Sequence, residues 1–291
     1  MTDARTGGDG VLWIVATPIG NLEDITLRAL RALREADVVL AEDTRRTRSL
    51  LRALSIDKEH VERLDDHVVR HKLPDLLARL AGGARIALVS DAGTPVVSDP
   101  GAVLVRAAAD AGVRVEAVPG PSAVLTALVV SGIASHGFRF VGFLPREGPE
   151  RQRAIASIAR DELPTVLFES PGRTHDTLVE LAASCGSARE AAVGRELTKM
   201  YEEVMRGALG ALAVQTADRV LGEVTLVVAG ASAAGTAEEN TEEALDSALD
   251  SAMAAGMKPS DAAREVAKAM GMKRAEVYAR VLARAGRKPP G

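Results

Sequence analysis

Aromatic residues, cysteine and histidine are all scarce in this chain of 291 residues. Seven residues are aromatic, so a core must be packed mainly from Leu, Val and Ala. The single cysteine, Cys185, excludes an internal disulfide and is typical of a protein from a reducing cytoplasm. The five histidines are scattered and form no Cys/His cluster at metal-ligand spacing, so we expect no metal site.

Long apolar runs and two common ligand motifs are also missing. No run approaches the roughly 20 residues that span a bilayer, so we expect no membrane association. Residues 1–10 lack the hydrophobic segment of a signal peptide and are expected to form a disordered leader, which again favours a cytoplasmic location. Neither G-x-G-x-x-G nor G-x-x-x-x-G-K-[ST] occurs, which argues against hydride transfer with a dinucleotide and against NTP hydrolysis.

Apolar runs alternate regularly with segments of helical periodicity along most of the chain. Hydrophobic residues make up 47% of the sequence, enough for a sizeable core. The alternation predicts an α/β fold built on a mostly parallel sheet. We expect strands at residues 11–16, 38–41, 86–89, 113–118, 138–143, 165–168, 191–194 and 224–229.

Turn-forming residues and a polar linker divide the chain into domains. The run Pro119-Gly120-Pro121-Ser122 separates a predicted strand from an apolar helix, so it marks a boundary. Residues 231–241 are small and polar and are interpreted as a linker. We therefore expect a first α/β domain at 11–119, a second at 120–230 and a small helical tail at 242–291.

The segment Ile86–Gly101, I-A-L-V-S-D-A-G-T-P-V-V-S-D-P-G, is a candidate ligand loop. A short buried strand leads into turn residues and then into an apolar helix, the arrangement that presents backbone N–H groups beyond the end of a strand. Gly93 permits a positive φ and Pro95 stiffens the turn. An ordinary strand-to-helix turn remains the alternative, although this loop has more Asp, Pro and Gly than such a turn needs.

Four other predicted strands or their connections lead into similar loops, at residues 17–21, 119–123, 169–173 and 195–199. In an open α/β sheet such loops gather at one edge, where ligands bind. Since no phosphate-binding motif is present, the pattern favours an adenine-bearing ligand held without a phosphate cradle. S-adenosylmethionine is such a ligand.

The tail has the pattern of a helix-turn-helix. Ser260 is a plausible N-cap, Gly271 fits a C-terminal stop, and a second helix is expected over about 273–285. We expect the apolar residues Ala262, Val266 and Met270 to face Val277, Val281 and Leu282. A plain helical hairpin with a solvated face remains the alternative.

Charge is distributed unevenly between the tail and the rest of the chain. Residues 252–291 carry nine Lys and Arg against three Asp and Glu, a balance of +6. Since the net charge of the whole chain is −4, residues 1–251 have a net charge of −10. A basic tail on an acidic body favours contact with an anion such as nucleic acid. The candidate contacts on the second tail helix are Lys273, Arg280, Arg284 and Arg287.

Seven segments occur in the order found in a known enzyme family. They are L-W-I-V-A-T-P-I-G-N-L-E-D-I-T-L-R-A-L (12–30), A-E-D-T-R-R-T (41–47), S-D-A-G-T-P-V-V-S-D-P-G (90–101), P-G-P-S-A (119–123), G-F-L-P (142–145), G-R-E-L-T-K (194–199) and G-E-V-T-L-V-V (222–228). With the tail, they resemble the bacterial 16S rRNA (cytidine-2′-O)-methyltransferases of the tetrapyrrole-methylase superfamily. The resemblance is collinear over about residues 11–230.

The resemblance implies a two-domain tetrapyrrole-methylase-like fold, with S-adenosylmethionine in the cleft between the domains, and a homodimer. It also implies methylation of the 2′-hydroxyl of a P-site cytidine in the decoding centre of 16S rRNA, with the small ribosomal subunit as partner. The cofactor-binding residues that it implies are Pro18, Asp91, Gly93, Thr94, Pro95, Val97, Ser122, Ala123, Phe168 and Thr225.

Charged residues near predicted strand ends are candidates for handling the proton of the 2′-hydroxyl. We consider Glu42, Glu169 and Lys199 as catalytic, together with Asp43, although such residues are often ion-pair or capping residues. Arg45, Arg46 and Arg195 are better suited to contact RNA phosphate than to take part in chemistry.

The sequence departs from the family at two places and leaves two rival functions open. Residues 67–69 read H-V-V where the family often has H-N-E, and Pro171-Gly172 interrupts a motif that is often E-S-x-H-R. A tetrapyrrole C-methyltransferase is one rival, although those chains generally lack the basic tail and have G-G-D-P at residues 92–95. A non-catalytic rRNA-binding assembly factor is the other.

Overall fold

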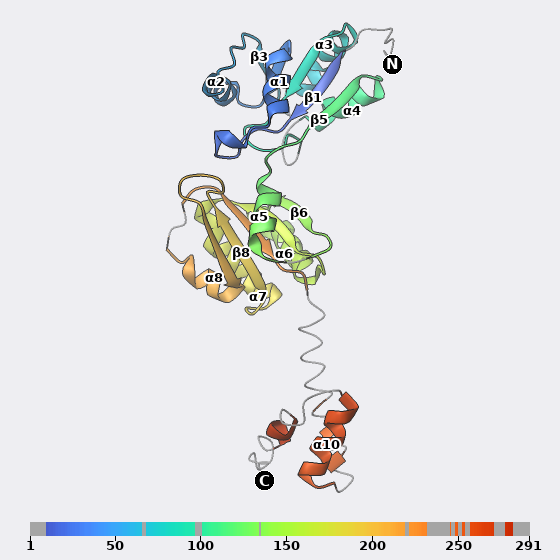
Figure 1. Ribbon diagram of the computed structural model, residues 1–291, viewed down its shortest axis with the longest axis vertical. Helices are drawn as coiled ribbons and strands as arrows, with labels where there is room; N and C mark the ends of the chain where they lie inside the picture. Colours follow the sequence, from blue (N-terminus) through green and yellow to red (C-terminus); the bar gives the residue numbers. More distant parts are fainter. Residues whose placement is uncertain are drawn as a thin grey trace. The chain divides into compact units, whose positions relative to one another are not determined.

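The computed structural model describes residues 10–65, 68–96, 101–133, 135–218, 221–231, 245, 248–249, 252–253, 257–270 and 277–281. The chain divides into two compact units, residues 1–230 and 231–291 (Figure 1). The first unit contains two five-stranded sheets, which define its first and second lobes. Most of the predicted leader and linker lies outside the described residues.

The first lobe is built on a wholly parallel sheet in the order β3-β2-β4-β1-β5. Its apolar strands alternate their side chains between two cores, so helices must cover both faces. The strands are β1 (Val11–Val15), β2 (Val38–Ala41), β3 (Val61–Arg63), β4 (Arg85–Leu88) and β5 (Arg114–Val118). The helices are η1 (Leu22–Asp24), α1 (Leu27–Glu35), α2 (Thr44–Ala53), α3 (Val69–Ala81) and α4 (Ala102–Asp110).

The second lobe has a mixed sheet in the order β6-β7-β10-β8-β9. Only β6 and β7 pair in parallel; the pairs β7–β10, β10–β8 and β8–β9 are antiparallel. The strands are β6 (Arg139–Phe143), β7 (Thr165–Glu169), β8 (Glu190–Arg195), β9 (Glu203–Ala208) and β10 (Val224–Val228). The helices are α5 (Ala123–Ser131), α6 (Gly148–Arg160), η2 (Pro171–Arg173), α7 (Thr174–Cys185) and α8 (Leu209–Gln215).

The expectation of mostly parallel pairing is correct for the first lobe and wrong for the second. In the second lobe β8 is joined to β9 by the short segment 196–202, and a short connection joins antiparallel neighbours. The strands β3 and β9 were not among the expected strands. Both lie at a sheet edge, where fewer side chains are buried and the apolar pattern is weak.

The second unit has a small apolar core of its own. Helix α10 runs over Pro259–Met270, and residues 277–281 are also helical. Its buried residues include the predicted Ala262, Val266, Val277 and Val281. The prediction of Ser260 as N-cap is wrong, because the helix already begins at Pro259, a residue whose fixed φ suits the first helical position.

Within the described part of the chain, no helix combines the length and the apolar character that a bilayer span requires. The two departures from the family pattern have structural roles. Val69, in the first, is 2% exposed and packs in the core beneath α3. Pro171, in the second, opens the short helix η2. His67 lies outside the described residues.

Candidate functional site

The loop after β1 is tied to the loop after β4 by a pair of backbone hydrogen bonds. The Thr17 N–H donates to the Gly93 carbonyl at 2.9 Å, and the Gly93 N–H donates to the Thr17 carbonyl at 3.0 Å. The hydroxyl of Ser90 donates to the carbonyls of Ala92 and Gly93, which fixes the turn from inside. The predicted ligand loop therefore has a defined shape, with Pro18 half-buried beside it.

Gly93 occupies a conformation and a space that favour glycine. Its φ is +78°, and an added Cβ would lie 3.3 Å from Cγ2 of Ile19 and 3.7 Å from the Pro121 carbonyl oxygen. The next residue extends this junction, since the Thr94 hydroxyl donates to the same Pro121 carbonyl at 3.2 Å. The ligand loop thus abuts the segment that leads into α5.

Helix α5 begins directly after that segment and lacks a side-chain cap. Ser122 is its N-cap residue, but its hydroxyl accepts no hydrogen bond from the first turn of the helix. No acidic residue lies in that turn either. The first-turn N–H groups, beginning at Ala123, therefore face no side-chain acceptor from Ser122 and can receive an anionic group.

Phe168 and Thr225 lie side by side on β7 and β10, where they are register partners. Phe168 packs edge-to-face on Phe140, with ring centroids 5.0 Å apart. Both phenylalanines belong to an apolar cluster that also contains Ala123 of α5 and Ile19 of the first lobe. Through Ile19, the loops of the first lobe and the α5 face of the second sheet contribute to one cluster.

Asp91 connects the ligand loop to the start of α2. Its Oδ1 accepts the Asp43 N–H at 3.2 Å, and its Oδ2 lies 3.4 Å from the guanidinium of Arg46. Asp43 in turn caps α2 by accepting the N–H groups of Arg45 and Arg46. These two backbone hydrogen bonds hold the pKa of Asp43 below its usual value. Asp91 was predicted to bind cofactor, and its observed contacts are with α2.

Lys199 sits in a group of charges beside the first-lobe loop. Its ammonium lies 2.8 Å from a Glu196 carboxylate oxygen and 3.2 Å from one of Glu223. Although partial burial alone would lower the pKa of Lys199, the hydrogen bond to Glu196 and the charge of Glu223 raise it overall. The backbone at Gly20 is so close that an added Cβ would lie 2.3 Å from Cγ of Lys199.

Glu169 is 2% exposed and is hydrogen-bonded through both carboxylate oxygens. Oε1 accepts the Ser170 N–H at 2.7 Å, and Oε2 accepts the Thr177 hydroxyl at 2.7 Å. The Arg173 guanidinium lies 3.4 Å from Oε2 and donates to the carbonyls of residues 144 and 145. These contacts join β7, η2, α7 and the loop after β6, and they favour a structural role for Glu169.

Glu42 follows β2 directly and is exposed. Among the described residues it takes part in no hydrogen bond or ion pair, unlike Glu169 and Lys199. Its neighbour Asp43 bonds to Asp91 of the ligand loop, so Glu42 lies at the same edge of the first sheet. Of the three candidate catalytic residues, Glu42 is the one with an available carboxylate.

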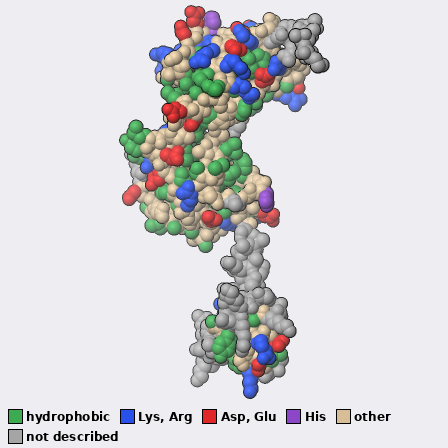
Figure 2. Space-filling view, viewed as in Figure 1, with side chains coloured by type: hydrophobic (Ala, Val, Ile, Leu, Met, Phe, Trp, Pro, Cys, Tyr) green, Lys and Arg blue, Asp and Glu red, His purple; other side chains and the backbone are tan. Residues whose placement is uncertain are grey.

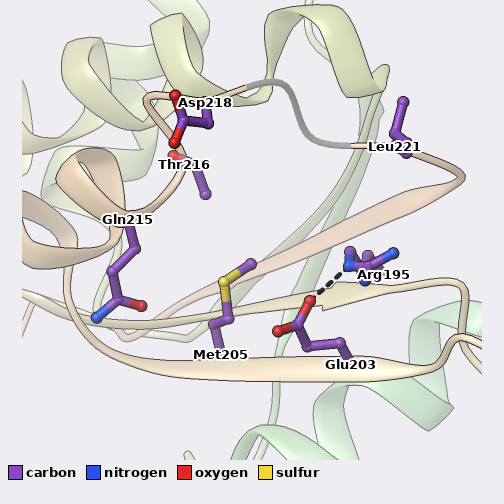
Figure 3. A pocket seen from close by; sticks show the side chains of 7 residues that line it. All are labelled: Arg195, Glu203, Met205, Gln215, Thr216, Asp218 and Leu221. Carbon is purple, nitrogen blue, oxygen red and sulfur yellow. Dashed lines mark hydrogen bonds and ion pairs between the residues drawn. The ribbon is translucent and has the colours of Figure 1, made fainter.

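Arg195 lines a cavity of about 260 Å³ (Figure 3). Its Nε donates to a Glu203 carboxylate oxygen at 2.5 Å, and the wall continues through Gln215, Thr216 and Asp218. Strand alternation places Arg195 on the same side as Val193, which packs with α8, whereas Phe168 packs on the α5 side. The cavity is therefore on the opposite face of the second sheet from Phe168.

Several predicted site residues cannot be placed in this way. Val97, Lys273, Arg284 and Arg287 lie outside the described residues. Arg280 is within a described helical segment of the second unit, and Arg45 and Arg46 are exposed at the start of α2. Sequence reasoning also missed three charge partners. Glu196 and Arg173 lie only three and four residues from Lys199 and Glu169, so their spacing was a signal that could have found them. Glu223 is brought to Lys199 only by folding.

Comparison with known proteins relates both units to described families. Residues 11–213 match the family model for Tetrapyrrole (Corrin/Porphyrin) Methylases, and residues 238–285 match the RsmI C-terminal HTH domain. The fold is similar to a cobalt precorrin-4 methyltransferase (TM-score 0.56, 20% identity, 78% of this chain and 97% of that one). It is also similar to a uroporphyrin-III C-methyltransferase of Thermus thermophilus complexed with S-adenosylhomocysteine (TM-score 0.54, 21% identity, 75% and 97%).

Curated relatives are considerably closer in sequence. The chain is 46% identical to ribosomal RNA small subunit methyltransferase I of Mycobacterium tuberculosis strain CDC 1551 over 94% of its length and 95% of the relative's. It is 44% identical to the enzyme of the same name from Mesorhizobium japonicum, over 93% and 91%. The predicted fold is therefore confirmed, and the chain belongs to the tetrapyrrole methylases and, among them, to the ribosomal RNA small subunit methyltransferase I family.

Proposed function

We propose that this protein transfers a methyl group from S-adenosylmethionine to the 2′-hydroxyl of a P-site cytidine in 16S rRNA. The observation that carries the proposal is the relatedness to ribosomal RNA small subunit methyltransferases over almost the whole chain, tail included. The ligand loop, the start of α5 and the surface around Phe168 support the proposal. They supply close backbone approach, uncapped N–H groups and an aromatic face, which suit S-adenosylmethionine.

The residues present fit S-adenosylmethionine. Gly93 leaves open the space that a Cβ would fill against Ile19, so backbone can approach a ligand closely there. The uncapped N–H groups at the start of α5 suit the carboxylate of the methionine moiety. Phe168 and Thr225 offer an aromatic face and a hydroxyl near that helix, suited to the adenosine. We assign the remaining contacts to Pro18, Thr94, Pro95, Val97, Ser122 and Ala123.

When bound, S-adenosylmethionine supplies an electrophilic methyl group. The chain must then align the ribose oxygen and accept its proton. We assign the proton to Glu42, the available carboxylate at the ligand edge. Lys199 cannot serve as base near neutral pH, since its pKa is raised, but its positive charge can orient the substrate beside Gly20. Glu169 holds the neighbouring loops in place.

We assign RNA contacts to Arg45 and Arg46 beside the ligand loop, to Arg195, and to the basic residues of the tail. Arginine pairs with phosphate through two parallel hydrogen bonds, and its charge makes binding sensitive to salt. The small ribosomal subunit would thus be held by surfaces on both units of the chain. Such a substrate places the protein in the cytoplasm.

We further propose that the protein is a homodimer that pairs through α5. This helix is apolar on all sides, and while Val124 and Ala127 are buried, Leu125 and Val129 remain 52% and 79% exposed. The exposed pair is spaced i, i+4 and forms one apolar strip suited to a second copy of itself. Light scattering should find a dimer for the native protein and a monomer for Val129→Glu. A native monomer at micromolar concentration would contradict the proposal.

The proposed activity is tested by incubating reconstituted small subunits with the protein and labelled S-adenosylmethionine, then mapping the label. Label on the ribose of one cytidine is the expected result. The Glu42→Gln variant should bind both partners normally and react roughly 10²–10⁴-fold more slowly, the range for a lost general base. Labelling of a tetrapyrrole instead, or RNA binding without any transfer, would support one of the two rival functions.

A further inference from the structure

The exposed sides of α1 and α2 carry arginines with almost no acidic partners. Helix α2 contains four arginines in ten residues and no acid, and helix α1 places arginines every third residue. The exposed arginines that concern us are Arg31, Arg34, Arg45, Arg46, Arg48 and Arg52. Figure 2 shows Lys and Arg side chains exposed on the first lobe, with Asp and Glu side chains among them.

These side chains face solvent because the opposite sides of both helices are buried. Ala29, Ala32 and Leu33 of α1 share one core cluster with Leu51 of α2, so the two helices cover the same face of the first sheet. Lys58 strengthens this arrangement by donating to the carbonyls of residues 34 and 36 at the end of α1. The arginines of both helices are therefore exposed on the same side of the first sheet.

Within the described ranges, most of this positive charge is not neutralised by an ion pair. Among the described residues, Arg46 is the only one of the six that forms an ion pair, with Asp91. Arg48 and Arg52 bond to backbone carbonyls, which hold the side chains without cancelling their charge. A surface with several unpaired guanidinium groups suits a partner with repeated negative charges.

The surface starts at the ligand site. Asp91 of the ligand loop binds both the backbone at the start of α2 and the side chain of Arg46. Each helix then runs away from that edge for about 14 Å, at 1.5 Å per residue. Neither helix has an aromatic side chain on which a base could stack. The chemistry thus favours contact with a sugar-phosphate backbone over reading of bases.

We propose that α1 and α2 form an RNA-backbone docking surface that guides the substrate strand to the ligand loop, separately from the tail. This inference rests on the proposed function for the identity of the RNA. It adds Arg31, Arg34, Arg48 and Arg52 to the contacts, and it makes Asp91 the residue that positions the docking surface against the site.

The test uses the full-length protein and compares two triple variants with equal loss of charge. Arg31→Gln, Arg34→Gln and Arg52→Gln remove charge from the proposed surface. Arg106→Gln, Arg153→Gln and Arg160→Gln remove it from exposed positions on α4 and α6. Binding to small-subunit rRNA is measured across a salt titration, with calorimetry for S-adenosylmethionine and thermal unfolding to establish folding.

We expect the first triple variant to bind rRNA at least tenfold more weakly, with a log–log salt slope shallower by about 2, since each phosphate contact contributes roughly 0.7–0.9. Its cofactor affinity should equal that of the native protein. If native protein methylates rRNA while both triple variants bind it equally well, the proposal that α1 and α2 dock RNA is wrong and the proposed function stands. Native protein that neither binds nor methylates rRNA would overturn both.

Discussion

At the scale of single residues, Gly93 gives the sharpest test of the ligand site. Gly93→Val should weaken S-adenosylmethionine binding at least tenfold, about 1.4 kcal/mol, because the side chain fills the space beside Ile19. Gly132 is a matched control, since its φ is also +78° but nothing lies within 4 Å of an added Cβ. Both valines strain the backbone by roughly 1–2 kcal/mol. Calorimetry on the two folded variants should separate the effect of crowding at the site from that of backbone strain. Equal cofactor affinity of the Gly93→Val and Gly132→Val variants would show that this loop does not bind the cofactor.

The pair of Glu196 and Lys199 makes stability depend on pH. The hydrogen bond from Lys199, and then that from the Glu223 N–H, lowers the pKa of Glu196 from its usual 4.5. Its contribution is therefore present above pH 4.5 and is lost as the pH falls through the lowered value. The pKa of Lys199 is raised, so the pH dependence of its contribution to stability is opposite to that of Glu196. This contribution is present below pH 10.5 and is lost as the pH rises through the raised pKa.

Thermal unfolding of native protein and Glu196→Gln across this range should show the effect. The native protein should be more stable at neutral pH, and the two melting temperatures should converge in acid as Glu196 takes up its proton. Glu150→Gln, at a position 77% exposed, should follow the native curve throughout. A difference between native protein and Glu196→Gln that does not change with pH would show that the ion pair contributes nothing.

Sequence reasoning anticipated the turn geometry of the candidate ligand loop better than the charge partners near it. Gly93, Thr94 and Ser122 belong to short motifs in which neighbouring Gly, Pro and Ser residues predict a turn from the local sequence alone. Glu196 lies three residues before Lys199 and is also a local partner, but Glu223 is distant in sequence and reaches Lys199 only through the antiparallel pairing of β8 and β10. The same holds for Asp91, whose link to α2 depends on β2 lying beside β4.

At the scale of elements, the buried Glu169 network holds four segments of the second lobe together. Glu169→Ala should lower the free energy of unfolding by about 3–5 kcal/mol, because it leaves Arg173 and Thr177 without their buried partner. Asp110→Ala, which removes a 60% exposed partner of the 81% exposed Arg106, should cost about 1 kcal/mol or less. Urea unfolding measures both, and equal costs would contradict the structural role.

The elements of the first lobe were the more predictable from sequence. Its interior strands β1, β2 and β4 are largely buried, so each reads as a compact apolar run, and β2 matches its expected bounds at residues 38–41. Strand β9 instead has no buried residue at its sheet edge, and its sequence, E-V-M-R-G-A, shows no two-residue alternation of apolar and polar residues. Helix α3 starts at Val69, whose side chain is in the core.

At the scale of the whole molecule, the separate core of the second unit allows the tail to be removed cleanly. A chain ending at Gly235 keeps both sheets and should fold and bind S-adenosylmethionine as the native protein does. It should lose much of its affinity for small-subunit RNA, with a shallower salt slope, because the +6 segment is gone. Full methylation efficiency in the truncated protein across a salt titration would show that the tail has no part in RNA binding.

A charge-reversed variant at Arg280, Arg284 and Arg287 is the companion experiment, since it keeps the tail in place. It should reproduce the loss of RNA affinity without any change in cofactor binding. Truncation and charge reversal that differ in their effect on RNA would assign the contact to other parts of the tail.

The position of β10 bears on how the nascent chain acquires its structure. Every strand of the first sheet has been synthesised by Val118, so that lobe can fold while translation continues. The second sheet must wait, because its central strand, Val224–Val228, is made last and inserts between β7 and β8. Until then, β7 and β8 each expose an unpaired edge to other chains and to chaperones. Premature termination before residue 228 should therefore yield a folded first lobe joined to an aggregation-prone remnant.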